Sequence, residues 1–81
     1  MKCKVLFFAA AAQAMECREK EIQVTSGATV GDVFDSLAST CAPLASLSTS
    51  CAFAVDGQLA RRDLPLREGC TVAILPPVSG G

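Results

Sequence analysis

The stretch "TVGDVFDSL", residues 29–37, carries the clearest helical pattern in the chain. Thr29 and Asp32 have the spacing of an N-cap and an N3 residue, an approximate capping box in which Asp replaces the usual Glu. Apolar residues then follow at positions i, i+3, i+4 and i+7, namely Val30, Val33, Phe34 and Leu37. We expect a helix that begins after Thr29, ends near Thr40 ahead of Pro43, and lies across a sheet.

Two strand-like stretches come before this helix. Residues 2–9 alternate, so Cys3, Val5 and Phe7 share one face of a strand while Leu6 and Phe8 extend the other, which begins with Lys2 and Lys4. The following "AAAAQAMEC", residues 9–17, favours a helical turn by composition, although an irregular connection also fits. Residues 19–24 predict a second short strand, with Ile22 and Val24 facing inward.

Strand signals return after the helix. The segment "CAFAVDGQLA", residues 51–60, is typical of a β-hairpin that turns at Asp56-Gly57, with Phe53 and Val55 facing the core. Residues 70–75 predict a last strand, with Val72 and Ile74 on one face and Thr71, Ala73 and Leu75 on the other. Residues 36–55 hold no charge, which indicates a Ser/Ala-rich loop beside a buried strand or a neutral docking surface.

This order of elements predicts an α+β protein of the β-grasp type, a mixed sheet packed on one main helix. We expect residues 1–75 to form that domain and residues 76–81 to form a flexible tail. In this topology the first and last strands lie parallel at the centre of the sheet. Leu6 and Phe8 would then lie beside Ala73 and Leu75, as an apolar patch on the sheet face away from the helix.

Composition excludes several classes of function. The 81 residues include no His, Tyr or Trp, which removes Ser–His and Cys–His nucleophiles and the commonest metal ligand. The five cysteines are dispersed, so we expect buried thiols rather than a metal site or a disulfide framework. The net charge of −1 without a basic run argues against nucleic-acid binding. A first strand fits the N-terminus better than a signal peptide, so we expect a cytoplasmic protein.

The chain ends in "PPVSGG", residues 76–81, which is unusual directly after a strand. Pro76 and Pro77 stop the ladder and favour an extended stalk. Gly80 and Gly81 have no side chains, so this end could enter a channel that admits only backbone. The combination predicts a stiff stalk that presents the terminal carboxylate of Gly81 to an enzyme.

In these features the sequence resembles the family of small, sulfur-carrying subunits of molybdopterin synthase. "KVLFFA" (residues 4–9) and "EGCTVAILPPVSGG" (residues 68–81) carry the resemblance, and "TVGDVFDSL" supports it. The resemblance implies a ubiquitin-like β-grasp fold. It also implies that a ubiquitin-activating-type enzyme adenylates Gly81 with ATP, and that a persulfide donor converts it to a thiocarboxylate. The sulfur would then pass to cyclic pyranopterin monophosphate during molybdenum cofactor biosynthesis.

By this resemblance the chain is a non-catalytic carrier with no bound cofactor or metal, and the large subunit supplies the catalytic side chains. Two copies of each subunit are expected in the synthase. Gly80 and Gly81 would carry the chemistry, and the partner-binding residues would be Phe8, Ala73, Leu75, Pro76, Pro77, Val78 and Ser79. Three other functions stay open: a thiamine-pathway sulfur carrier, a ubiquitin-like protein modifier, and a β-grasp interaction module whose tail has no role.

Overall fold

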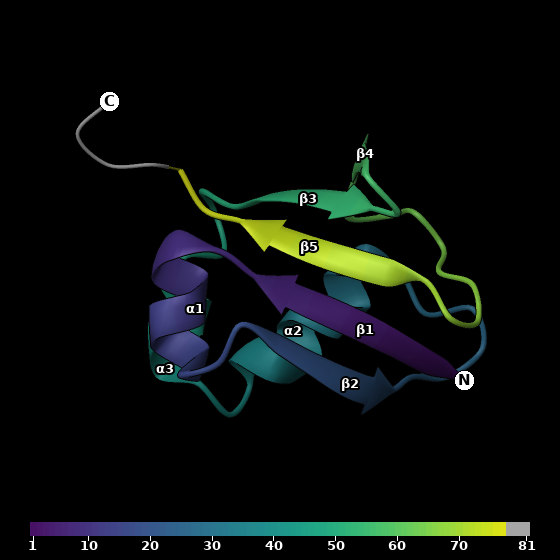
Figure 1. The fold of residues 1–81 in the computed structure, drawn as a ribbon, viewed down its shortest axis with the longest axis horizontal. Coiled ribbons are helices and arrows are strands. Elements are labelled where there is room, and N and C mark those ends of the chain that lie inside the picture. Colours follow the sequence, from purple (N-terminus) through teal and green to yellow (C-terminus); the bar gives the residue numbers. More distant parts are fainter. Residues whose placement is uncertain (78–81) are drawn as a thin grey trace.

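A mixed five-stranded sheet forms the body of the protein over residues 1–77, the part of the chain that the computed structural model describes (Figure 1). The strand order is β2-β1-β5-β3-β4. β1 and β5 run parallel at the centre, and the other neighbouring strands are antiparallel. This confirms the predicted β-grasp arrangement. The strands are β1 (Lys2–Phe7), β2 (Glu19–Gln23), β3 (Ala52–Val55), β4 (Gln58–Ala60) and β5 (Thr71–Leu75).

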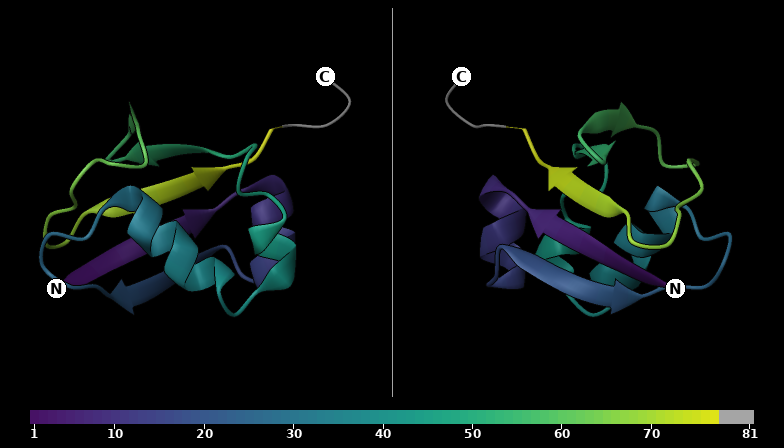
Figure 2. Two further views of the ribbon diagram at one scale, coloured as in Figure 1. Left: turned by 180° about the vertical axis from the view of Figure 1, so that it is seen from behind. Right: turned by 45° about the vertical axis from the view of Figure 1, so that its right-hand side comes forward.

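The described helices cover one face of this sheet and leave the other face open (Figure 2). The longest of them is α2 (Val30–Ala38), which crosses the sheet as expected, while α1 (Ala9–Met15) and α3 (Ala42–Ala45) lie together at one end. α1 confirms the helical reading of the alanine run. α3 was not predicted, because Pro43 reads as a helix breaker; it occupies the first turn, where a missing N–H costs nothing.

The capping box of α2 forms as the sequence predicts. The Asp32 N–H donates to Thr29 Oγ1 at 3.2 Å, and the Thr29 N–H donates to Asp32 Oδ2 at 3.0 Å. The helix ends at Ala38 with Ser39 as C-cap, slightly earlier than the expected end near Thr40. Its apolar stripe, which holds Val30, Val33, Phe34 and Leu37, is buried against the sheet.

The core lies between the inner face of the sheet and the three helices. The predicted alternation holds, because the inward side chains of β1 and β5 are buried: Cys3, Val5, Phe7, Val72 and Ile74. The rings of Phe34 and Phe53 meet edge to face with centroids 5.6 Å apart, which joins α2 to β3. Leu44 is fully buried and carries α3 into the same core. Val55, expected to face the core, is half-buried at its margin.

The hairpin between β3 and β4 also forms as predicted. Asp56 and Gly57 both have positive φ, 50° and 86°, which is the backbone of a type I′ turn. The Asp56 carboxylate accepts the N–H of Thr71 at 2.9 Å and so fixes the hairpin to the start of β5. No helix in residues 1–77 is both long enough and apolar enough to cross a bilayer.

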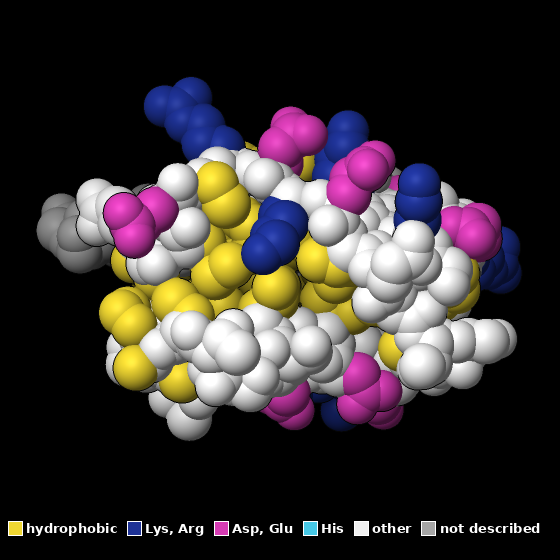
Figure 3. Space-filling view, turned by 90° about the horizontal axis from the view of Figure 1, so that it is seen from below, with side chains coloured by type: hydrophobic (Ala, Val, Ile, Leu, Met, Phe, Trp, Pro, Cys, Tyr) yellow, Lys and Arg dark blue, Asp and Glu magenta, His cyan; other side chains and the backbone are white. Residues whose placement is uncertain are grey.

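The opposite edge of the sheet, formed by β2, is marked by charge. Glu19, Lys20 and Glu21 are exposed there, which discourages pairing with another strand. Behind this edge Ile22 and Val24 are half-buried rather than fully inward. Figure 3, seen from below, shows hydrophobic side chains across the middle of this side of the molecule and charged side chains toward its upper and lower edges.

Candidate functional site

The open face of the sheet carries an apolar surface formed by neighbouring positions on four strands. Leu6 of β1 pairs in register with Ala73 of β5, and Ala73 pairs with Ala54 of β3. Ala54 in turn pairs with Leu59 of β4. Paired residues point to the same side of a sheet, so these side chains share the face that the helices leave open. With Phe8 and Leu75 they form the outer patch: Leu6, Phe8, Ala54, Leu59, Ala73 and Leu75.

Exposure distinguishes this patch from the core. Phe8 is 46% exposed and Leu59 is 81% exposed. Leu6, Ala54, Ala73 and Leu75 are half-buried by their neighbours in the sheet. An apolar surface of this kind on a small chain is typical of a protein–protein contact. Phe8 also borders a shallow hollow lined by Leu6, Ala12 and Arg18, among others.

The patch contains the residues that the sequence assigned to it and extends further. The expected neighbours Leu6, Phe8, Ala73 and Leu75 lie together, as strand parity predicted. Ala54 and Leu59 were missed as members of the surface. Their alternation along the hairpin was visible in the sequence, but only the order β5-β3-β4 shows that they continue this face.

The chain continues from β5 into Pro76 and Pro77 at the margin of the outer patch. β5 ends at Leu75 (Figure 1), and of the two residues that follow, Pro76 is buried and Pro77 is exposed. Partner binding by Pro76 stays a prediction, and its burial leaves little of the ring available to a partner in this conformation. The other tail residues assigned to chemistry or partner binding, Val78, Ser79, Gly80 and Gly81, lie outside the described residues.

The Cys51 thiol lies just before the neighbouring strand β3, close to the C-terminal end of β5. Cys51 directly precedes Ala52, and Ala52 pairs with Leu75 at the end of β5. Burial raises the pKa of the Cys51 thiol above its usual 9.0. The thiol therefore stays protonated at neutral pH and is a weak nucleophile toward an activated carboxyl group.

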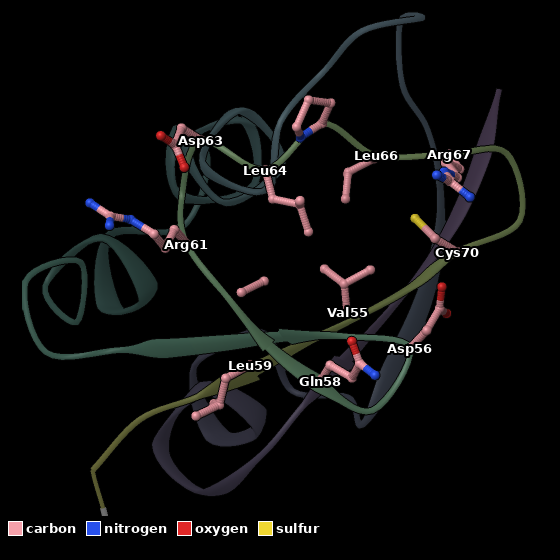
Figure 4. Close-up of a pocket in the computed structure, with 12 residues that line it drawn as sticks. Val55, Asp56, Gln58, Leu59, Arg61, Asp63, Leu64, Leu66, Arg67 and Cys70 are labelled. Carbon is pink, nitrogen blue, oxygen red and sulfur yellow. The ribbon is translucent and has the colours of Figure 1, made fainter.

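A larger hollow lies between β4 and the loop that leads to β5, and it lacks the features of an active site. Figure 4 shows Val55, Leu64 and Leu66 pointing into it, whereas Arg61 and Asp63 point away. Leu59, on the same hairpin, also points away from this hollow. The polar groups around it do not converge on one point, as those of a ligand site would.

The outer patch and the residues that follow β5 therefore lie next to each other, at one end of the open sheet face. Together with the strand order, this arrangement defines a ubiquitin-like β-grasp protein.

The chain belongs to the ThiS family, which it matches over residues 5–81. It is 31% identical over 83 residues to the molybdopterin synthase sulfur carrier subunit of Chlamydomonas reinhardtii, and the match covers 100% of both chains. The structure of SAMP1 from Haloferax volcanii shares 26% identity and a TM-score of 0.88, with 100% of each chain covered.

A third similarity is to a structure of the complex of subunits 1 and 2 of molybdopterin-converting factor from Helicobacter pylori. There the identity is 23% and the TM-score is 0.70, with 100% of each chain covered. This likeness shows the fold.

Proposed function

We propose that the chain is the sulfur carrier subunit of a molybdopterin synthase. The observation that carries the proposal is its full-length similarity to a subunit of that name, together with a family match that runs to Gly81. The folded body then provides the surface that partner proteins bind, and the terminal carboxylate is the group that reacts. We place this activity in the cytoplasm.

The chemistry follows from the weakness of a carboxylate as an electrophile. An activating enzyme transfers AMP from ATP to the Gly81 carboxylate and releases pyrophosphate, which gives the carbonyl a good leaving group. The outer sulfur of a persulfide displaces AMP and forms an acyl disulfide. A thiol then attacks the inner sulfur of that disulfide, the S–S bond breaks, and the thiocarboxylate leaves while the donor sulfur and the thiol become a disulfide. Because Gly81 has no side chain, little obstructs attack on its carbonyl.

The outer patch is the surface by which the carrier docks on the large subunit. That subunit supplies the catalytic side chains for sulfur transfer to cyclic pyranopterin monophosphate, which suits a chain without histidine. The similarity to the Helicobacter pylori subunit complex, in which two subunits are bound together, supports a partner of this kind.

The direct test is the intact mass of the purified protein after incubation with ATP, an activating enzyme and a sulfur source. Replacement of one carboxylate oxygen by sulfur is the expected product. A matched control carries one extra glycine after Gly81, which keeps the body intact and moves the reacting carboxylate. If both proteins gain sulfur at the same rate, or neither gains it, the proposal is wrong.

A second candidate function is protein modification, because SAMP1 is a small archaeal modifier protein and its structure is similar along the whole chain. The same adenylated carboxylate would then be attacked by a lysine amine of a target protein. The two functions have different products: a thiocarboxylate in one case, and an isopeptide bond between Gly81 and a lysine in the other. Peptide mapping of the products in cells separates them.

A further inference from the structure

Two buried thiols meet on the central strands of the sheet, far along the chain from each other. Cys3 lies on β1 and is 2% exposed, and Cys70 directly precedes β5 and is 4% exposed. Their sulfur atoms are 3.2 Å apart. Cys41, by contrast, does not face another thiol in its hydrogen bond: its S–H donates to the carbonyl oxygen of Ala14 at 3.3 Å.

The backbone positions of this pair suit a covalent link. The Lys4 N–H donates to the Cys70 carbonyl at 3.0 Å, and Lys4 pairs with Thr71 one position further on. Cys3 and Cys70 are therefore lateral neighbours on adjacent strands. Adjacent strands lie about 4.7–4.9 Å apart, and the Cα atoms of a disulfide usually lie about 4.4–6.8 Å apart. The sulfur atoms need to approach by about 1.1 Å to reach the bond length of about 2.05 Å.

We propose that Cys3 and Cys70 form a peroxide-responsive modification site, in which oxidation by hydrogen peroxide joins β1 to β5 through a disulfide. The site is separate from the tail and does not depend on the proposed function. Peroxide is the oxidant that fits because it is small, whereas a glutathione-sized disulfide could not reach thiols this deeply buried.

The hollow beside β4 gives the oxidant its approach to Cys70. Cys70 lines that hollow and lies at its edge in Figure 4. Cys70 is the thiol that meets peroxide, because Cys70 lines the hollow and Cys3 does not. Cys3 is the thiol that resolves the product, since its sulfur lies 3.2 Å from that of Cys70. Burial and the hydrogen bond with Cys70 raise the pKa of the Cys3 thiol to about 11, so it stays protonated until it reacts.

The reaction balances in two steps. The Cys70 sulfur attacks one peroxide oxygen, the O–O bond breaks, and the departing hydroxide takes the thiol proton to form water and a sulfenic acid. The Cys3 sulfur then attacks the sulfenic sulfur, the S–S bond forms, and the S–O bond breaks. The leaving hydroxide takes the Cys3 proton as a second water. Two electrons pass from the thiol pair to peroxide.

The link forms at the start of the two strands, whereas Leu75 lies at the other end of β5. The register of Leu6 with Ala73 in the outer patch need not change. Oxidation should therefore stabilise the fold without removing the docking surface. Because the disulfide closes a loop of more than sixty residues, we expect the Tm to rise by at least about 10 °C.

The test is peptide mapping of the folded, full-length protein after treatment with hydrogen peroxide and blocking of the remaining thiols. Trypsin cuts after Lys2, Lys4 and Arg67, so the expected product is the dipeptide of residues 3–4 joined to the peptide of residues 68–81. This product should disappear on reduction. Recovery of Cys3 and Cys70 as separately blocked thiols, or their linkage to other cysteines, would overturn the proposal.

The thermal readout has its own control. Peroxide should raise the Tm of the unmodified sequence and leave that of Cys70→Ser unchanged. Cys3→Ser provides the same comparison if Cys70→Ser does not fold. A rise in Tm that persists in either variant would refute the assignment, because one thiol alone cannot form the link.

Discussion

Replacing Leu59 by Asp should weaken docking of the large subunit while leaving the carrier folded. Leu59 is 81% exposed on the outer patch, so most of its apolar surface is still available to a partner. Full burial of a leucine side chain is worth about 2 kcal/mol, and the exposed part therefore accounts for about 1.6 kcal/mol, or about 15-fold in Kd. Burying the new carboxylate beside apolar groups adds to this loss.

The same arithmetic sets the expected effect on folding. The part of Leu59 that the fold already buries is worth about 0.4 kcal/mol, so the urea midpoint should hardly move. Gln58→Asp is the matched control, because Gln58 is exposed on the same strand, pairs with Val55 and points to the opposite face. Isothermal titration with the large subunit measures both variants. Equal affinity for the two would refute the outer patch as the docking surface.

Three further predictions concern stability. Thr29→Ala removes one half of the capping box and should cost about 1 kcal/mol in the free energy of unfolding; an unchanged urea midpoint would contradict that role. Leu44→Ala should cost about 2–5 kcal/mol because Leu44 is fully buried, and a cost below about 1 kcal/mol would mean that α3 is not part of the core. Under reducing conditions, the unfolded Cys3 thiol ionises near pH 9.0 and the folded one only near pH 11, so stability should fall as pH rises between these values, by up to about 2–3 kcal/mol. Urea titrations of Cys3→Ala should show a smaller fall, and equal falls would exclude Cys3 as the cause.

The sequence was informative where a local pattern determines the structure. The capping box and apolar stripe of α2 predicted the helix, and Asp56-Gly57 predicted the hairpin turn. Alternation along residues 2–9 and 70–75 predicted which side chains point inward. These features depend on residues close together in the chain.

The features that were missed depend on contacts between distant segments. α3 is too short to show a helical period, and Leu44 reads as an isolated leucine until α3 packs against α1 and α2. Leu59 joins the outer patch only because β3 pairs with β5. The approach of Cys3 to Cys70 needs the parallel register of β1 and β5, which no spacing along the sequence reveals.

The place of β5 in the sheet has a consequence for folding. β1–β2 and β3–β4 are antiparallel pairs of nearby segments, and β5 is the strand that joins these two pairs. Because pairings between distant segments form slowly, we expect the pairing of β5 with β1 to form late in folding. The outer patch spans both halves, so it exists only after β5 has inserted. A partner that binds the outer patch therefore binds only the fully folded protein, because the patch is incomplete until β5 has paired.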